Sequence, residues 1–105
     1  MVGEVSDQEF EKEVIQSDLP VLLDMWAPWC GPCRMVEPVV EKLSEVYDGK
    51  LKCMRMNVDE NPLTAAKYRI MSIPTLMVFK GGDVVEAVIG AVPERVLAAK
   101  IDSVL

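Results

Sequence analysis

Two cysteines, Cys30 and Cys33, stand close together in the segment WCGPC, separated only by Gly31 and Pro32. A disulfide between them would close a loop of four residues. The loop-entropy relation gives such a loop only about 2 kcal/mol of stabilisation, against about 3 kcal/mol for a 15-residue loop. Residues three apart on a starting helical turn lie on the same side of it, at a separation that a disulfide can span. The spacing therefore favours a disulfide that forms and breaks reversibly over a structural one.

The reactive form of a cysteine is the thiolate, and a free thiol with a pKa of about 8.5 is mostly protonated at neutral pH. If a helix begins at Pro32, the unpaired amides of its first turn point toward the Cys30 sulfur and stabilise its negative charge. We expect Cys30, exposed at the mouth of the turn, to be the attacking thiol. Cys33, one turn inside the helix, would then resolve the mixed disulfide. Gly31 leaves room for a partner and Pro32 stiffens the turn.

A carboxylate, Asp24, interrupts the apolar run VLLDMW just before this motif. A charge in a buried strand is costly unless it has a partner or a task. The chain has no histidine, so the usual general base near neutral pH is missing. Asp24 could accept the proton of Cys33, because burial raises the pKa of a carboxyl group. Alternatively, Asp24 reaches a solvated strand end or pairs structurally with Arg55, and the sequence leaves both interpretations open.

The composition limits the class of protein. The 105 residues, half of them apolar, are enough for one core, and we expect a single domain over residues 1–105. The net charge of −6 argues against a nucleic-acid partner. No apolar run is long enough to span a bilayer, and the first residues lack the pattern of a signal peptide. We therefore expect a cytoplasmic monomer that binds neither nucleic acid nor membranes.

The hydrophobic pattern predicts alternating helices and strands. Ser6 and Glu9 form a capping-box pattern at the start of the first helix, and Asn61 is the expected cap of a later one. We expect a helix from residue 6 to about 17, a buried strand over 20–27, a long helix ending at 48–49, a strand over 50–59, a short helix over 61–68, a hairpin over 74–90 and a helix from 93 onward, with a short strand at 2–5. This order predicts a mixed sheet with helices on both faces, and chemistry at the carboxyl end of the central strand.

Taken together, these residues resemble the thioredoxin family. Besides WCGPC and the buried Asp24, the proline at position 38 and the segments NVDENP and SIPT follow in the family's order and spacing, as does Gly90. The resemblance implies an α/β thioredoxin fold, with a five-stranded mixed sheet flanked by four helices. It also implies a general protein disulfide reductase that acts on disulfide-containing proteins and is recharged by a thioredoxin reductase. We expect no cofactor and no metal.

The resemblance also suggests a substrate surface around Cys30. Alone, Pro74 would be assigned as a trans proline at the start of a strand. The family context favours a cis Ile73-Pro74 bond, which would present backbone groups of Ile73 and Thr75 to an extended substrate segment. For Trp29 the alternative is ordinary packing, whereas Trp26 is expected to support the turn from the core. The apolar docking surface would comprise Trp29, Ile73, Pro74, Gly90 and Ala91.

Two features depart from the family pattern or lie outside it. Arg55 stands where the family usually has a lysine, and it stays charged at any relevant pH. It could hold Asp24 ionised more firmly and make it a weaker base. Cys53 is expected to be a buried, inert thiol, and the seven methionines are expected to be flexible core filler.

Two other functions compete with disulfide reduction. One is a metal-binding module that uses Cys30, Cys33 and Cys53 with a carboxylate. A closed zinc site takes four ligands, however, and the chain has neither histidine nor a second cysteine pair. The other is a docking module of the same fold in which the redox chemistry is incidental.

Overall fold

A five-stranded sheet forms the centre of the protein in the computed structural model, which describes all residues from 1 to 105. In spatial order the strands are β1 (Gly3–Glu4), β3 (Lys52–Asn57), β2 (Val21–Trp26), β4 (Thr75–Lys80) and β5 (Asp83–Ile89). The first three are mutually parallel, whereas β4 runs antiparallel to both of its neighbours. The sheet is therefore mixed and β2 is central, as the apolar run of this strand predicts.

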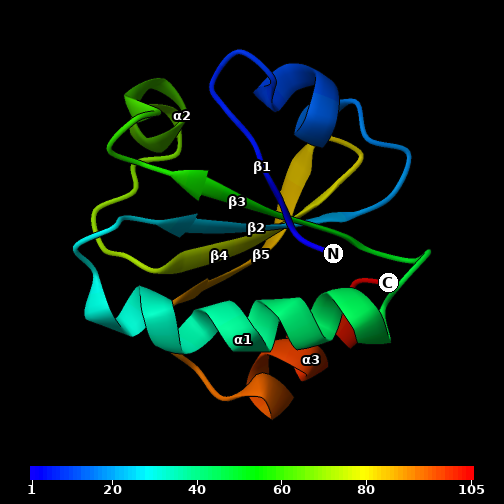
Figure 1. Cartoon of the computed structure of the whole chain (residues 1–105). Helices are drawn as coiled ribbons and strands as arrows, with labels where there is room; N and C mark the ends of the chain where they lie inside the picture. Colours follow the sequence, from blue (N-terminus) through cyan, green and yellow to red (C-terminus); the bar gives the residue numbers. More distant parts are fainter.

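Four helical segments cover the two faces of the sheet: η1 (Glu11–Ile15), α1 (Gly31–Val46), α2 (Pro62–Lys67) and α3 (Glu94–Asp102). Figure 1 shows α1 and α3 together on one face, with α2 and the N-terminal helix at the opposite side. None of these helices combines the length and the hydropathy that a membrane span requires. The expected mixed sheet with four flanking helices is confirmed.

The first helix differs from its prediction in length and type. The capping box forms, because Ser6 N–H donates to Glu9 Oε1 at 3.1 Å and Glu9 N–H donates to Ser6 Oγ at 3.3 Å. The helix nevertheless runs only from Glu11 to Ile15, with Phe10 as its N-cap, rather than from residue 6 to about residue 17. Gln16 N–H donates to the carbonyl of Glu11, five residues back, which is the wider spacing of a π-turn.

The cap of α2 also differs from the expectation. The side chain of Asn61 does not cap this helix; it accepts from Asp7 N–H at 2.8 Å and donates to the Asn57 carbonyl at 3.0 Å. Asp7 takes the capping role from a distant part of the chain. Its carboxylate accepts from Leu63 N–H at 3.1 Å and from Thr64 N–H at 2.9 Å. The prediction failed because it considered only residues adjacent in sequence.

Two apolar clusters lie on opposite faces of the sheet, and alternation along β2 divides the side chains between them. Leu22 packs in the cluster that α1 and α3 cover, whereas Leu23 and Met25 pack in the cluster under η1 and α2. A strand places alternate side chains on the same face, so Asp24 shares the face of Leu22. The buried carboxylate thus lies on the side of the sheet that α1 covers.

The sulfur-containing residues follow the predictions only in part. Cys53 is buried, as expected. Four methionines are buried too, but Met1, Met35 and Met71 are largely exposed. Treating all seven methionines as core filler is therefore wrong, because Met35 lies on the outer side of α1 and Met71 in the loop before β4.

Candidate active site

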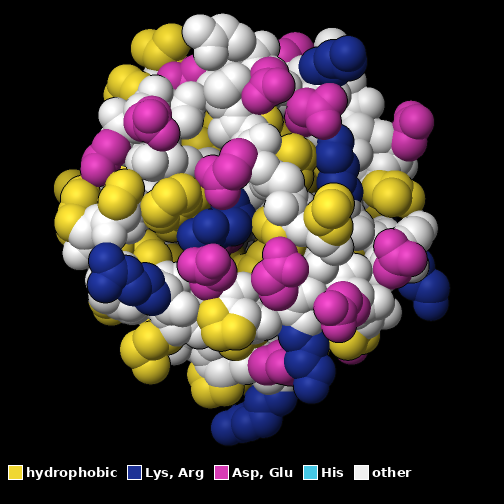
Figure 2. All heavy atoms as spheres, in the orientation of Figure 1, with side chains coloured by type: hydrophobic (Ala, Val, Ile, Leu, Met, Phe, Trp, Pro, Cys, Tyr) yellow, Lys and Arg dark blue, Asp and Glu magenta, His cyan; other side chains and the backbone are white.

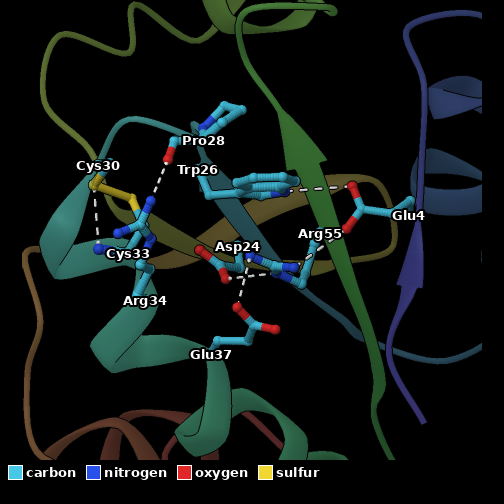
Figure 3. Close-up of polar contacts among 9 residues, drawn as sticks. All are labelled: Glu4, Asp24, Trp26, Pro28, Cys30, Cys33, Arg34, Glu37 and Arg55. Carbon is cyan, nitrogen blue, oxygen red and sulfur yellow. Dashed lines mark hydrogen bonds and ion pairs between the residues drawn. A yellow bond between two sulfur atoms is a disulfide. The ribbon is translucent and has the colours of Figure 1, made fainter.

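The two cysteines of the motif are joined by a disulfide at the start of α1. Cys30 is the N-cap residue, and Pro32 lies in the first turn, where its missing N–H breaks no helical hydrogen bond. Cys33 N–H donates to Cys30 Sγ at 3.1 Å (Figure 3). A first-turn amide therefore points at the Cys30 sulfur, which is the arrangement that the sequence predicts for a stabilised thiolate.

The exposure of Cys30 differs from the expectation. In the disulfide form Cys30 is only 4% exposed and Cys33 is buried as well. Both sulfurs are turned toward each other and pack with Ala27 and Ile73. The space beside the neighbouring residue, Gly31, is open, because a Cβ added there would meet no atom within 4 Å. The turn is thus open beside Gly31, whereas the side chain of Cys30 is covered.

The segment with Ile73 and Pro74 contacts both the disulfide cluster and the loop after β5. Ile73 packs against the cluster that contains both cysteines, and the Ile73-Pro74 bond is cis. Gly90 N–H donates to the Pro74 carbonyl at 2.8 Å, which ties the loop after β5 to the start of β4. Thr75 is buried in β4, with Oγ1 donating to the Ser72 carbonyl at 2.6 Å. Ala91 follows Gly90 and is exposed.

Trp29 stands out from the surface next to the disulfide, with 70% of its area exposed. Its Nε1–H donates to Asp59 Oδ2 at 3.0 Å, a partner that the sequence analysis did not find. Ordinary core packing is thereby excluded for Trp29. The ring borders an apolar groove of about 260 Å³, which is lined by Trp29, Val58, Pro62, Ala65, Ile70, Met71 and Ile73. Trp26, by contrast, is half-buried and packs against the disulfide cluster, as expected.

Asp24 is fully buried, so the interpretation that it reaches a solvated strand end is wrong. Arg55 Nε–H donates to Asp24 Oδ2 at 3.4 Å, whereas Oδ1 has no hydrogen-bond partner. Burial raises the pKa of Asp24 from 3.8 to about 6, and the nearby Arg55 charge only partly offsets it. Asp24 is therefore both paired with Arg55 and able to take up a proton near neutral pH.

Arg55 contacts two further carboxylates that the sequence analysis did not identify. Its Nη1 lies 3.5 Å from Glu4 Oε2 and its Nη2 lies 3.7 Å from Glu37 Oε2. The guanidinium carbon is 4.3 Å from the centre of the Trp26 ring, a cation–π contact. Figure 3 shows these side chains converging from β1, β2, β3 and α1. The spacing of Glu37, four residues after Cys33 on one helical face, was a usable signal for its position.

Cys53 is separate from this site. It packs in the cluster between the sheet and α1, and burial raises the pKa of its thiol to about 11. No group of three or more histidine, cysteine, aspartate or glutamate side chains is placed to hold a metal ion. The structure therefore does not assemble the ligand set that the metal-binding alternative required.

Comparison with known proteins shows which family this sequence resembles. The family model described as Thioredoxin matches residues 1–103. The thioredoxin of Synechocystis sp. is 57% identical over 102 residues, which cover 97% of this chain and 95% of that protein. Thioredoxin 1 of Nostoc sp. is 54% identical over 100 residues, which cover 95% of this chain and 94% of that protein. The chloroplastic M-type thioredoxin of Chlamydomonas reinhardtii is 50% identical, covering 98% of this chain and 74% of its own length. The chain, with its cysteine pair joined at the start of α1, belongs to the thioredoxin family.

Proposed function

We propose that this thiol-disulfide oxidoreductase reduces the disulfides of other proteins with Cys30 as the attacking thiol and Cys33 as the resolving thiol. One observation carries the assignment: the first-turn amide of Cys33 donates to Cys30 Sγ at the N-terminus of α1. The same amide and the positive end of the helix stabilise a thiolate at Cys30 after reduction. No backbone amide donates a hydrogen bond to Cys33 Sγ, so the two sulfurs are chemically unequal.

The reaction takes place in two exchanges. The Cys30 thiolate attacks one sulfur of the substrate disulfide, which forms a mixed disulfide and releases the other substrate sulfur as a thiolate. Cys33 then loses its proton and attacks Cys30 Sγ, which releases the second substrate thiolate and forms the Cys30–Cys33 disulfide. The substrate gains two electrons and two protons, and the protein is left in the disulfide state described above. A reductase that donates two electrons restores the dithiol.

Asp24 is the proposed acceptor of the Cys33 proton. It is buried on the face of the sheet that α1 covers, the helix that carries Cys33. Its raised pKa of about 6 makes it a better base than an exposed aspartate, while it is still largely ionised at neutral pH. In a chain without histidine, it is a suitable group to take this proton.

The proposed substrate surface surrounds the exposed edge of the active-site turn. Trp29, held by Asp59, and the exposed Ala91 would contact the substrate through apolar surface. The backbone of Ile73 and Thr75, on either side of the cis proline, would pair with an extended substrate segment. Gly31 gives that segment room, and Pro32 keeps the turn rigid. Figure 2 shows hydrophobic side chains gathered on the left of the molecule, where β2 ends and α1 begins.

The remaining proposals concern the chain as a whole. We propose that residues 1–105 form one domain that works as a monomer, receives electrons from a thioredoxin reductase and binds no nucleic acid. A reducing compartment such as the cytoplasm suits a disulfide that must be reopened after each turnover. The net charge of −6 supports the absence of a phosphate-backbone partner.

Three variants test the cysteine roles. Cys30→Ser should abolish reduction of a protein disulfide such as those of insulin, whereas Cys33→Ser should accumulate a covalent mixed disulfide that is detectable by mass spectrometry. Cys53→Ala is the matched control and should keep the parent rate. Normal multiple turnover by Cys33→Ser would refute the two-thiol mechanism. Full activity of Cys30→Ser in cells would favour a docking module instead.

A further inference from the structure

The guanidinium of Arg55 forms ion pairs with three carboxylates beside the disulfide. The Arg55 side chain, 14% exposed, faces Asp24 from β2, Glu4 from β1 and Glu37 from α1, at nitrogen–oxygen separations of 3.4, 3.5 and 3.7 Å. A planar guanidinium carries five N–H groups in a fixed fork, so it can face several acceptors at once. Figure 3 shows Glu4 and Glu37 on different sides of this guanidinium.

Of the two surface carboxylates, Glu4 has a second hydrogen-bond partner besides Arg55. Glu4 Oε1 also accepts from Trp26 Nε1–H at 3.3 Å, and the Trp26 ring lies against the guanidinium that Glu4 faces. Glu37 lies on α1, one turn after Cys33, and about half of its side chain is exposed. Strand β1 and helix α1 thus approach the same arginine from two sides.

An arginine that faced Asp24 alone would stabilise the ionised carboxylate and make it a weak base. Sharing the charge changes this balance, because each additional carboxylate near the arginine cancels part of its field at Asp24 and repels the Asp24 charge. With all groups ionised the cluster of one cation and three anions has an excess of negative charge. That excess favours proton uptake at the one member that is fully buried.

We propose that Glu4 and Glu37 are positioning residues that share the charge of Arg55, so that Asp24 keeps its ability to accept a proton beside a permanently charged neighbour. The proposal rests on the role of Asp24 as proton acceptor given above. It extends that role to two residues that touch neither the thiols nor the substrate. Both act through Arg55 and through the field at Asp24.

The charged groups that face Asp24 are consistent with this assignment. Burial is the main cause of its raised pKa; Arg55 lowers the pKa, and Glu4 and Glu37 raise it. Strand β4 adds no charge, because the residue in register with Asp24 there is Leu76. In the reduced protein the thiols of Cys30 and Cys33 would titrate as well. The disulfide form therefore isolates the carboxylate cluster.

The test is a titration of the Asp24 side-chain carboxyl carbon by NMR in the disulfide form of the protein. We compare the parent with Glu4→Gln, Glu37→Gln and the double variant. Glu41→Gln is the matched control, since it removes the same charge one turn farther along α1 at an exposed residue with no ion pair. Because Glu4 and Glu37 are about half exposed, neither change disturbs the core.

Each single variant should lower the proton affinity of Asp24 about threefold, as expected for a unit charge several ångströms away in well-screened surroundings. The double variant should lower it about tenfold, and Glu41→Gln should match the parent. Unchanged titration of Asp24 in the single variants, or an equal change in Glu41→Gln, would overturn the proposal. The role of Asp24 itself is tested separately: if Asp24→Asn resolves mixed disulfides at the parent rate, the base role fails, while the titrations still decide whether Glu4 and Glu37 act on Asp24.

Discussion

Replacing Asp24 with asparagine should stabilise the folded protein at neutral and alkaline pH, although it should slow the resolving step. The carboxyl group is fully buried, and its pKa is about 6 in the folded protein against an ordinary value of 3.8. A tenfold difference in proton affinity corresponds to about 1.4 kcal/mol, so ionising Asp24 costs the folded state about 3 kcal/mol at high pH. Asparagine removes this cost while keeping nearly the same volume.

The sign of the pH dependence follows from which state holds the proton more tightly. The folded protein binds the Asp24 proton more tightly than the unfolded chain does, so the stability associated with this proton is fully present below pH 3.8. It is lost progressively as the pH rises through about 6. The parent should therefore lose up to about 3 kcal/mol between these limits through this group alone, whereas Asp24→Asn should not.

The assay is urea unfolding of both proteins in the disulfide form at several pH values between 4 and 8. The difference in unfolding free energy between the two proteins should increase with pH, by about 2.5 kcal/mol in favour of the variant between pH 4 and pH 8. Asp48→Asn, a change at an exposed aspartate, is the control and should show no such trend. A difference that stays constant with pH, or favours the parent at pH 8, would refute the assignment of a costly buried charge to Asp24.

Three further predictions concern residues outside the redox centre. Burial raises the pKa of Cys53 to about 11, so iodoacetamide at pH 8 should leave Cys53 unmodified in the folded, reduced protein, as peptide mass mapping would show. Asp7→Ala should lower the unfolding free energy by about 1–2 kcal/mol at pH 7, because α2 loses its cap. Burial raises the pKa of Asp7, but hydrogen bonds from Thr64 outweigh this effect, and the pKa in the folded protein lies below 3.8. The destabilisation by Asp7→Ala should therefore be complete above pH 3.8 and should shrink as the pH falls through the lowered folded-state pKa, which thermal unfolding at a series of pH values would show. Tyr47→Phe removes the 2.6 Å hydrogen bond from the phenol to Asp102 and should cost about 1 kcal/mol in urea unfolding.

Features that depend on local pattern were predictable from the sequence. The apolar run that becomes β2, the amphipathic α1 and the glycine pair of the hairpin each contain their signal within a few residues. Gly81 and Gly82 indeed have positive φ angles of 61° and 85°, as the turn between β4 and β5 requires. The motif WCGPC likewise identifies the helix start that carries the chemistry.

The failures share a physical cause, which is that a distant group satisfies a local need. Asn61 is a suitable cap by type, yet Asp7 reaches α2 from 56 and 57 residues away. Asp59 holds the Trp29 ring although nothing in its neighbourhood in the sequence indicates this contact. Cys30 is buried in part because Ile73, far away in the sequence, packs against the cluster of Ala27, Cys30 and Cys33.

The same reasoning applies to Arg55, whose effect cannot be judged from its own identity. Considered with Asp24 alone, a permanent cation should make the carboxylate a weak base. In the folded chain the guanidinium faces two more carboxylates, and burial outweighs its influence on Asp24. A lysine presents one point of charge rather than a planar fork, so it could not face Glu4, Asp24 and Glu37 with the same geometry. The arginine and the two flanking glutamates are therefore best understood as one unit, because residues 4, 37 and 55 together set the electrostatic field at Asp24.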